Sequence, residues 1–487
     1  MVNLITNNLD INTHELFELT RAFYPNLDVV IDSTTTKAEI LILISFEDNK
    51  YDLSLLKDGQ EVDLESIKVD SVNIFKDIKS TRKTALKKAL FFLLKRDTSK
   101  DLPWGILTGI RPVKIVEDLF SKGINESSTL RVLMEEYLLS DEKAKLIIDV
   151  SKRQKMVIDK LKKNNYSLYV NIPFCPSKCV YCSFPTLTIK KYGNLMENYL
   201  KVLKKEILAT KDIMKNWELS TIYIGGGTPT TLTIEQMEYL IILLKESFIG
   251  FREFTIEAGR PDTINEEYLK LFKKYNIDRI SINPQTMNDK TLKTIGRQHN
   301  SKDILETYSV AKRIGIPVVN MDLIIGLPGE GIEELKYTLD LIKELDPENL
   351  TVHTLSIKKG SKFKEEKDNY NINDSIVIQK MINETVRFAK EMDLYPYYLY
   401  RQKQILGNFE NVGYAKTNKL CLYNISIMEE KETIIALGMG GVSKFYNKEL
   451  KTIERLSNFR NIEEYLNRVD ELIQSKKENI YKIEKYW

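Results

Sequence analysis

A regular alternation of apolar and amphipathic segments dominates the middle of the 487-residue chain. Short apolar runs with strand character alternate with longer segments in which apolar residues recur at the period of a helix. The strand-like runs lie at 167–172, 220–225, 252–257, 278–283, 317–325 and 349–356. The helix-like segments lie at 193–214, 233–247, 264–275, 301–314 and 331–345. This order predicts βαβ units and a parallel sheet.

Six such units fit between residues 166 and 356. A closed eight-unit barrel usually takes about 250 residues, which is more than this region contains. The pattern therefore predicts an α/β fold built on an incomplete, TIM-like (β/α)6 barrel. In β/α barrels, function collects at the carboxyl ends of the strands. Residues of unusual chemistry stand at those ends: Cys175 to Cys182, Gly225 to Gly227, Glu257, Gln285, Asp322 and Ser356.

The alternation is absent from residues 1–165, for which we predict an N-terminal α+β domain of unknown role. Residues 39–46 have strand character. Residues 80–95 have helical spacing, with Ser80 as a plausible N-cap. The charged segment 141–164 has helical character and could connect this domain to the barrel.

The alternation also stops after residue 356, and we predict a mixed C-terminal domain at 357–487 that covers the substrate. The tyrosine-rich segment Tyr395 to Lys403 has two interpretations. It could border a flat, carboxylated substrate, with Arg401 and Lys403 pairing with carboxylates. An amphipathic strand with its tyrosines in the core is the simpler interpretation.

Composition narrows the class of protein. Hydrophobic residues make up 43% and charged residues 29% of the chain, which suits a globular protein with a real core. The net charge of +3 gives no argument for a nucleic-acid partner, and we predict none. No apolar run approaches the roughly 18 residues of a membrane span, and the N-terminus lacks the pattern of a signal peptide. We therefore predict a cytoplasmic protein.

Three of the four cysteines lie within eight residues, in the sequence Cys175-x3-Cys179-x2-Cys182. In a reducing cytosol such a cluster favours metal binding over a disulfide framework. Cubane iron–sulfur clusters usually take four cysteines, so three would leave one iron open to another ligand. A zinc site completed by Cys421 or a histidine is the alternative, although zinc sites more often use pairs of cysteines. For Cys421 we favour a small, buried apolar role.

Two further segments have a functional and a structural interpretation. The glycines of Gly225 to Thr230 would let a ligand approach the backbone closely, or would simply form a tight βα turn. A carboxylate at the end of an apolar strand needs a partner, so Glu257 would bind a ligand or form a structural salt bridge.

The segment IPFCPSKCVYC resembles the cysteine loop of the radical S-adenosylmethionine superfamily. It is similar to the version in oxygen-independent coproporphyrinogen III oxidases (dehydrogenases), and the resemblance runs from about Tyr169 through Phe445. The segments LPWGILTGIRPVK and YLYRQKQILGNFENVGYA resemble the longer branch of that family, which carries an extra N-terminal domain. The resemblance implies a radical S-adenosylmethionine barrel that holds a [4Fe–4S] cluster on the three clustered cysteines.

The resemblance also implies two S-adenosylmethionine molecules per chain. The residues implied for the first are Tyr169, Tyr181, Gly226, Gly227, Thr228 and Glu257. Those implied for the second are Gln285, Arg297, Asp322 and Ser356. From the residues alone, Arg297 and Asp322 could instead form a buried ion pair. No catalytic residue beyond the cluster and cofactor sites is predicted.

The implied reaction is the oxidative decarboxylation of coproporphyrinogen III to protoporphyrinogen IX by a 5′-deoxyadenosyl radical, without dioxygen, in haem biosynthesis. A tetrapyrrole substrate and a flavodoxin- or ferredoxin-like electron donor follow from it. The alternatives are another tetrapyrrole radical enzyme, such as a haem-opening methyltransferase, and a haem chaperone. The chaperone branch usually carries a His-Asn-x-x-Tyr-Trp-like motif, where this chain has only ENVGYA.

One position departs from the family pattern. Asn171 stands where the family often has histidine, two residues after the leading tyrosine. An imidazole can carry a proton near neutral pH and an amide cannot, so the substrate or the efficiency could differ. We expect His299 to serve packing or the surface.

Overall fold

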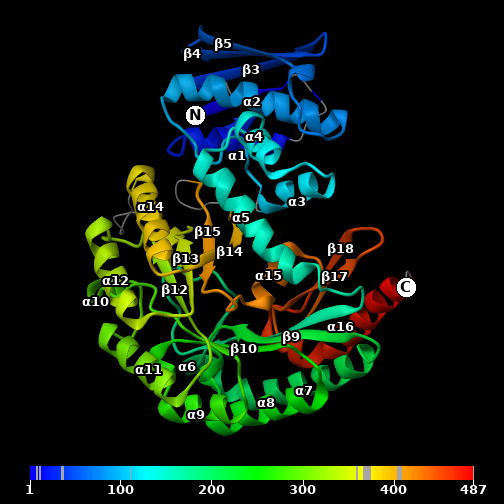
Figure 1. Cartoon of the computed structure of the whole chain (residues 1–487), viewed down its shortest axis with the longest axis vertical. Coiled ribbons are helices and arrows are strands. Elements are labelled where there is room, and N and C mark those ends of the chain that lie inside the picture. The colour runs from blue at the N-terminus through cyan, green and yellow to red at the C-terminus, as the bar shows by residue number, and fades with distance from the viewer. Residues whose placement is uncertain are drawn as a thin grey trace. The chain divides into compact units, whose positions relative to one another are not determined.

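The computed structural model describes residues 1–6, 9, 13–33, 38–109, 111–357, 360–365, 374–402 and 408–485, without the side chain of Lys364. The chain forms two compact units, Met1–Lys152 and Arg153–Trp487 (Figure 1). The domain boundary predicted at residue 165 lies inside the second unit, and the region predicted as a separate C-terminal domain belongs to the same unit as the barrel strands.

The first unit is built on a five-stranded sheet in the order β2-β1-β3-β4-β5. Its strands are β1 (Val2–Ile5), β2 (Val29–Ile31), β3 (Ile40–Glu47), β4 (Lys50–Lys57) and β5 (Gln60–Lys68). Its helices are α1 (Thr13–Phe23), α2 (Ile78–Thr98), α3 (Val113–Ser121) and α4 (Glu126–Glu135), followed by α5 (Asp141–Ile158). Helix α2 confirms the predicted helix, but its N-cap is Asp77, whose carboxylate accepts from the backbone N–H of Ser80. The carboxylate of Asp77 therefore fills the capping role predicted for Ser80.

The second unit contains six parallel strands that lie side by side in chain order. They are β6 (Asn165–Ile172), β9 (Glu218–Gly226), β10 (Glu253–Gly259), β11 (Arg279–Ile282), β12 (Val319–Ile325) and β13 (Asn349–Thr354). The connecting helices are α7 (Met196–Ile213), α8 (Ile234–Ser247), α9 (Glu266–Lys274), α10 (Asp289–Thr294), α11 (Ser301–Ile314) and α12 (Ile332–Leu345). Figure 1 shows α7, α8, α9 and α11 around the outside of these strands. The predicted (β/α)6 barrel is confirmed.

The C-terminal segments extend both edges of the same sheet, whose order is β14-β15-β13-β12-β11-β10-β9-β6-β16-β17-β18. Strands β14 (Tyr395–Tyr400) and β15 (Asn411–Ala415) pair antiparallel beside β13, and β16 (Thr433–Leu437) pairs parallel to β6. Strands β17 (Val442–Asn447) and β18 (Thr452–Ser457) complete that edge. The remaining elements are β7 (Phe174–Cys175), β8 (Leu187–Thr188), α6 (Ile189–Tyr192), α13 (Lys362–Glu365), α14 (Ser375–Glu391), α15 (Leu422–Glu429) and α16 (Ile462–Glu484).

The two faces of the parallel sheet differ in chemistry. Successive side chains of a strand point to opposite faces. On β11, Ile280 and Ile282 are fully buried, whereas Arg279 and Ser281 alternate with them and carry polar groups. Parallel strands are usually apolar on both faces because helices cover them. The side of β11 that carries Arg279 and Ser281 is therefore polar, and Arg279 forms an ion pair there with Glu253.

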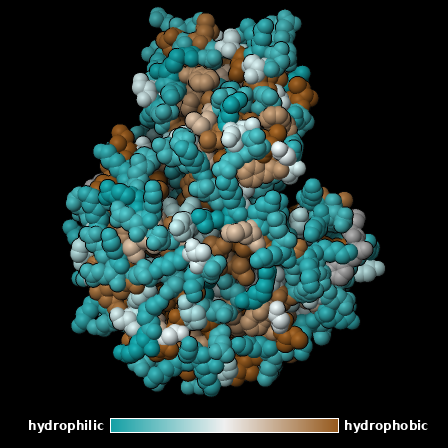
Figure 2. All heavy atoms as spheres, viewed as in Figure 1, coloured by the Kyte–Doolittle hydropathy of each residue, from teal (hydrophilic) through white to brown (hydrophobic). Residues whose placement is uncertain are grey.

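The surface follows the usual distribution. Hydrophilic side chains dominate the face shown in Figure 2, with apolar side chains scattered among them. Scattered exposed apolar side chains are normal for globular proteins. Within the described residues, no helix combines the length and apolar character that a membrane crossing requires.

A buried ion pair joins α7 to α16. Glu206 and Lys476 form it, and their side chains are 0% and 1% exposed. Glu206 also accepts from the hydroxyl of Tyr465 at 2.7 Å and from the backbone N–H of Gly438 at 2.8 Å. Lys476 donates to the backbone carbonyl of Ala436 at 2.7 Å. The pair therefore holds the loop after β16 between the two helices.

Replacing Lys476 with Met should destabilise the protein by about 3–5 kcal/mol, because the Glu206 charge would stay buried without its cation. The free energy of unfolding, measured by urea denaturation, checks this value. Lys205→Met is the matched control, because Lys205 joins the same two helices through Asp470 at the surface. Exposed pairs of this kind contribute about 0–1 kcal/mol. Equal losses for the two variants would contradict the expected result.

Candidate active site

The cysteine loop begins where β6 ends. Cys175 closes the short strand β7, and Cys179 and Cys182 follow in a turn in which the N–H of Cys182 donates to the carbonyl of Cys179 at 3.1 Å. Cys175 and Cys179 are buried and Cys182 is partly exposed, and all three are free thiols. The N–H of Val180 donates to the carbonyl of Ile295 at 3.2 Å. This bond fixes the loop against the segment that follows α10.

Two of the three thiols, Cys175 and Cys182, sit in an environment that opposes their ionisation. Burial is the main cause that raises the pKa of Cys175 and of Cys182, and the neighbouring thiols raise both further. The hydroxyl of Thr228 lies 3.5 Å from the Cys175 sulfur, and together with the Arg260 charge it favours the thiolate. Three clustered thiolates therefore need a cation between them, which an iron–sulfur cluster would provide.

Cys421 is not placed to complete a zinc site with the cysteine loop. Among the described residues, no three His, Cys, Asp or Glu side chains converge on a single ion, whereas the cysteines of a cubane cluster each bind a different iron and need not converge. Cys421 donates to Glu253 at 3.3 Å, and Glu253 is the first residue of β10. The cysteine loop follows the opposite, carboxyl end of β6, so Cys421 cannot complete a site with Cys175. Cys421 is buried, as expected, but as a hydrogen-bond donor rather than a simple apolar group.

The glycine segment after β9 lies directly against the cysteine loop. The N–H of Gly227 donates to the carbonyl of Ile172, and that of Thr228 donates to Phe174, each at 2.8 Å. A Cβ on Gly227 would lie 2.8 Å from the Cys175 sulfur. Gly226 has a φ of 117°. A Cβ on Gly226 would lie 2.3 Å from the side-chain oxygen of Asn171. Any side chain at these two positions would displace the loop, so the segment is more than a tight turn.

Glu257 lies at the end of β10, beside this glycine segment. Its carboxylate accepts from the Tyr223 hydroxyl at 2.6 Å and from the N–H of Gly226 at 3.3 Å. It forms no ion pair with any residue that the structure describes, so its observed partners are a hydroxyl and a backbone N–H. Burial raises the pKa of Glu257 to about 7, and the charge of Asp322 adds to the effect against the opposing hydrogen bond from Tyr223. A buried carboxyl poised near neutrality suits a cationic ligand group.

Tyr169 lies on β6 within a stack of three tyrosines. Its ring centroid is 6.0 Å from that of Tyr223 and 5.9 Å from that of Tyr423. Its hydroxyl donates to the side-chain oxygen of Asn171 at 3.2 Å. The Asn171 amide in turn donates to the carbonyl of Met439. Asn171 thus links β6 to the loop after β16, a structural role that requires no titratable proton.

Gln285 and Asp322 meet across β11 and β12. Gln285 has a φ of 66°, which is unusual for a residue with a side chain, and its N–H donates to the Asp322 carbonyl at 2.9 Å. Asn320 donates to the Asp322 carboxylate at 2.8 Å, and His353 lies 3.9 Å from it. Burial alone would raise the pKa of Asp322, but His353 and the hydrogen bonds outweigh it and lower the pKa. At neutral pH Asp322 is therefore ionised, whereas Glu257 is close to its pKa and only partly ionised.

Arg297 contacts the cysteine loop instead of Asp322. It donates to the Tyr181 hydroxyl at 2.9 Å, while its Nε and Nη1 atoms are buried with no hydrogen-bond partner among the described residues. The two residues form no ion pair with each other in the described structure, so that interpretation is wrong. Unpartnered buried guanidinium donors suit a carboxylate ligand. Ser356 stands just beyond the end of β13, at the same end of the barrel.

The tyrosine-rich segment forms strand β14, as its pattern predicts. Tyr397 and Tyr398 are buried, and the Tyr400 hydroxyl lies 3.2 Å from Nδ1 of His353. Arg401 is also buried and donates to the backbone carbonyl of Asn408. Lys403 lies outside the described residues. The tyrosines therefore belong to the core and the barrel lining.

Sequence reasoning missed several residues of this end of the barrel. Tyr223 and His353 stand on β9 and β13, and strand alternation places each on the polar inner face. That alternation was the available signal. His299, expected to serve packing or the surface, is buried and lies 3.2 Å from Asp262. Asp262 follows Arg260, which contacts the cysteine loop through Ser177.

Comparison with known proteins agrees with this arrangement. Residues 169–342 match the model of the radical SAM superfamily. The oxygen-independent coproporphyrinogen-III oxidase-like protein HemZ of Bacillus subtilis (strain 168) is 41% identical over 82% of this chain and 81% of its own length. The haem chaperone HemW of the same organism is 34% identical over 40% of this chain and 52% of its own length.

A solved structure shares the fold. Coproporphyrinogen III oxidase (HemN) of Escherichia coli, described as a radical SAM enzyme, aligns with a TM-score of 0.52 and 22% identity over 66% of this chain and 73% of its own. At this identity the likeness shows the fold alone. The radical SAM superfamily implies a [4Fe–4S] cluster and S-adenosylmethionine, and the donor set of the cysteine loop fits the cluster.

Anaerobically purified protein should contain about four iron atoms per chain. Replacing Cys175, Cys179 or Cys182 with Ala should abolish iron binding, because each thiolate would hold a different iron. Cys421→Ala is the matched control and should retain the iron, since that thiol bonds to Glu253. Iron and sulfide analysis with the visible spectrum checks this. Stoichiometric zinc lost only in the Cys421 variant would contradict it.

Affinity for S-adenosylmethionine should rise with pH through about 7. The Glu257 carboxyl is neutral below its raised pKa and anionic above it, and only the anion attracts the cofactor's cationic groups. Between pH 6 and pH 8 the affinity should increase about tenfold, because the ionised fraction rises by that factor. Glu257→Gln should bind more weakly and without this pH dependence. Equilibrium dialysis measures both, and a parallel pH dependence in the variant would exclude Glu257 as the cause.

Proposed function

Because the chain belongs to the oxygen-independent coproporphyrinogen-III oxidase-like family of radical SAM proteins, we propose that it decarboxylates coproporphyrinogen III oxidatively to protoporphyrinogen IX. The observation that carries the proposal is the joining of the cysteine loop and the glycine segment at one end of a polar barrel interior. That end also holds Glu257 and Asp322, two carboxylates with different protonation behaviour. The joined loops and the two carboxylates suit an enzyme that binds a cationic cofactor beside a cluster.

Cys175, Cys179 and Cys182 would hold the cluster. Tyr169, Tyr181, Gly226, Gly227, Thr228 and Glu257 would hold S-adenosylmethionine. When bound, these groups supply a 5′-deoxyadenosyl radical, the reagent that takes a hydrogen atom from a substrate propionate. The propionate would then lose carbon dioxide and pass one electron to an external electron acceptor, which leaves a vinyl group. The same sequence at a second propionate would complete the conversion.

The chain's own residues would orient the reactants and exclude water. Tyr223 donates a hydrogen bond that holds the Glu257 carboxylate toward Gly226. The bare backbone at Gly226 and Gly227 lets this segment pack directly against Asn171 and Cys175, so its backbone groups would lie close to a cofactor bound at the loop. The rings of Tyr169, Tyr223 and Tyr423 stack on one another, and this aromatic stack would limit the access of water to the site. A radical formed there would be shielded from solvent.

We also propose that Gln285, Arg297, Asp322 and Ser356 serve a second S-adenosylmethionine. The unpartnered donors of Arg297 support a carboxylate ligand in this second site, within the described residues. The ionised Asp322 supports an ammonium or ribose ligand. A substrate propionate is the rival for Arg297, because a guanidinium binds any carboxylate. A flavodoxin- or ferredoxin-like protein would deliver the electrons.

A haem-chaperone function is the second candidate, because relatives named haem chaperone HemW match part of the chain. A tetrapyrrole-modifying methyltransferase is a further alternative. The segment ENVGYA, which stands where the chaperone motif is expected, lies in and just before β15 and is fully buried. Its burial in the sheet supports a structural role there.

Reduced, cluster-loaded protein should release 5′-deoxyadenosine from S-adenosylmethionine, and coproporphyrinogen III should accelerate the release several-fold. Anaerobic assays with chromatography and mass spectrometry would detect the nucleoside and the vinyl product. Glu257→Gln should lower the rate by about 10²-fold, by loss of an interaction that positions the cofactor. Tight haem binding without stimulated cleavage would instead identify a chaperone, and a methylated product would identify a methyltransferase.

Two S-adenosylmethionine molecules should bind per cluster-loaded chain in the absence of tetrapyrrole. Arg297→Ala should remove one of them, because it deletes the donors for one carboxylate. The remaining molecule should still perturb the electron paramagnetic resonance spectrum of the cluster. Arg313→Ala is the matched control at an exposed arginine. One molecule bound by wild type, and unaffected by Arg297→Ala, would assign Arg297 to the substrate.

A further inference from the structure

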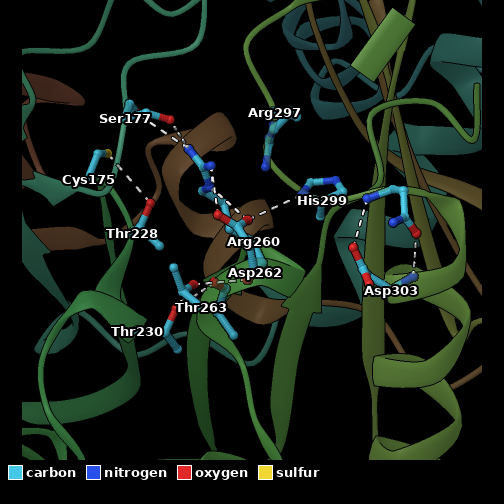
Figure 3. Close-up of polar contacts among 12 residues, drawn as sticks. Cys175, Ser177, Thr228, Thr230, Arg260, Asp262, Thr263, Arg297, His299 and Asp303 are labelled. Carbon is cyan, nitrogen blue, oxygen red and sulfur yellow. Dashed lines mark hydrogen bonds and ion pairs between the residues drawn. The ribbon is translucent and has the colours of Figure 1, made fainter. Parts of the chain in front are cut away.

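Arg260 connects the loop after β10 to the cysteine loop. Its guanidinium is almost fully buried, with the side chain 5% exposed. One edge, Nη1, donates to the hydroxyl of Ser177 at 3.0 Å and to its carbonyl at 3.3 Å. Nε and Nη2 donate to the two carboxylate oxygens of Asp262 at 3.1 Å and 2.8 Å (Figure 3). Ser177 lies between Cys175 and Cys179, so this cation is fixed on the segment that joins two of the three thiols.

Asp262 is held on the side of Arg260 away from Ser177. It also lies 3.2 Å from Nδ1 of His299, whose side chain is completely buried. Burial lowers the pKa of His299, so the imidazole is neutral at neutral pH and its Nδ1–H donates to Asp262. Thr263 donates to the Arg260 carbonyl at 2.9 Å, which closes the turn that carries both charges. Figure 3 shows the order Ser177, Arg260, Asp262, His299 across the end of the barrel.

The order of the two charges matters for the electrostatics of the loop. The cation contacts the loop directly, and the anion stands behind it. In a buried site such charges are screened little by salt. Arg260 therefore favours negative charge on the loop, and Asp262 reduces this effect while fixing the guanidinium in one orientation.

Simple support of the loop does not require this arrangement. The loop is also held by the backbone bond from Val180 to Ile295 and by the bonds that Gly227 and Thr228 make to the preceding strand. A buried ion pair is often no more stabilising than an apolar pair of similar volume. The chain nevertheless places a bidentate ion pair against the cysteine segment, with a neutral histidine completing it.

We propose that Arg260 and Asp262 are positioning residues that set the reduction potential of the cluster held by Cys175, Cys179 and Cys182. Arg260 raises the potential and holds the loop through Ser177, and Asp262 lowers the potential by offsetting that charge. Reduction of the cluster adds one negative charge, which a fixed cation stabilises and a fixed anion opposes. His299 keeps Asp262 ionised and in place. The inference rests on the cluster of the proposed function.

The two single variants should move the potential in opposite directions. Arg260→Gln removes the cation and leaves Asp262, so cluster reduction should become about tenfold less favourable, or about 59 mV lower for one electron. Asp262→Asn removes the anion and leaves Arg260, so the potential should rise by a similar amount. The double variant should lie between the two. Arg260→Lys keeps the charge and should stay closer to wild type than Arg260→Gln.

Redox titration of cluster-loaded protein, followed by electron paramagnetic resonance, measures these shifts. Arg313→Gln is the control, because Arg313 forms an exposed pair with Glu266 far along the chain from the cysteine loop and should change nothing. Shifts in the same direction for both single variants, or no shift in either, would overturn the inference. If Arg260→Gln fails to retain iron, the Asp262→Asn variant alone tests the inference, because in that variant Arg260 keeps its bonds to Ser177. A potential that does not rise in that variant overturns the inference.

Iron content separates this inference from the proposed function. Wild-type protein that binds no cluster after anaerobic reconstitution would refute the proposed function itself. A normal cluster whose potential ignores Arg260 and Asp262 would refute only the role of these two residues.

Discussion

The close approach of two backbones determines the arrangement of the whole site. Gly227 and Thr228 donate to the carbonyls of Ile172 and Phe174, so the segment after β9 continues the sheet beyond the end of β6. Only glycine leaves enough space there, since a Cβ at Gly227 would lie 2.8 Å from the Cys175 sulfur. This contact places the cysteine loop over the barrel interior. Tyr169, Glu257 and Asp322 stand on strands, and the strand register positions them relative to that loop.

The parallel register explains how distant residues meet. Because β10, β11 and β12 run in the same direction, Glu257, Gln285 and Asp322 all lie toward the carboxyl end of the barrel. Gln285 follows the end of β11 and has a positive φ, and it bridges to β12, where its N–H donates to the Asp322 carbonyl. A strained residue that the surrounding hydrogen bonds maintain is typical of a ligand site. This end of the barrel therefore carries one carboxylate with a raised pKa, Glu257, and one with a lowered pKa, Asp322.

Strand and helix periods were enough to predict the barrel, and the cysteine spacing singled out the loop that would hold a cluster. The sequence could not show that the C-terminal strands join the same sheet, because edge pairing depends on contacts between β15 and β13 and between β16 and β6 that are far apart in the chain. It likewise assigned the cap of α2 to Ser80, since Asp77 and Ser80 are both good caps and only geometry decides. The Arg260–Asp262–His299 contacts join two loops and have no local pattern. The ion pair considered for Arg297 and Asp322 was wrong because the chain directs Arg297 to Tyr181 instead.

The loop after β16 contacts the site through hydrogen bonds, although this part of the chain has no motif of its own. The buried Glu206–Lys476 pair fixes Gly438, and the next residue, Met439, accepts from the Asn171 amide through its carbonyl. Asn171 meets the Tyr169 hydroxyl and faces Gly226, so the ion pair lies only a few contacts from the predicted cofactor site. A histidine at position 171 would have to reproduce both amide contacts with a ring of different shape. Asparagine at this position is therefore matched to the loop after β16, and the missing imidazole is a consequence of how this chain supports its barrel edge.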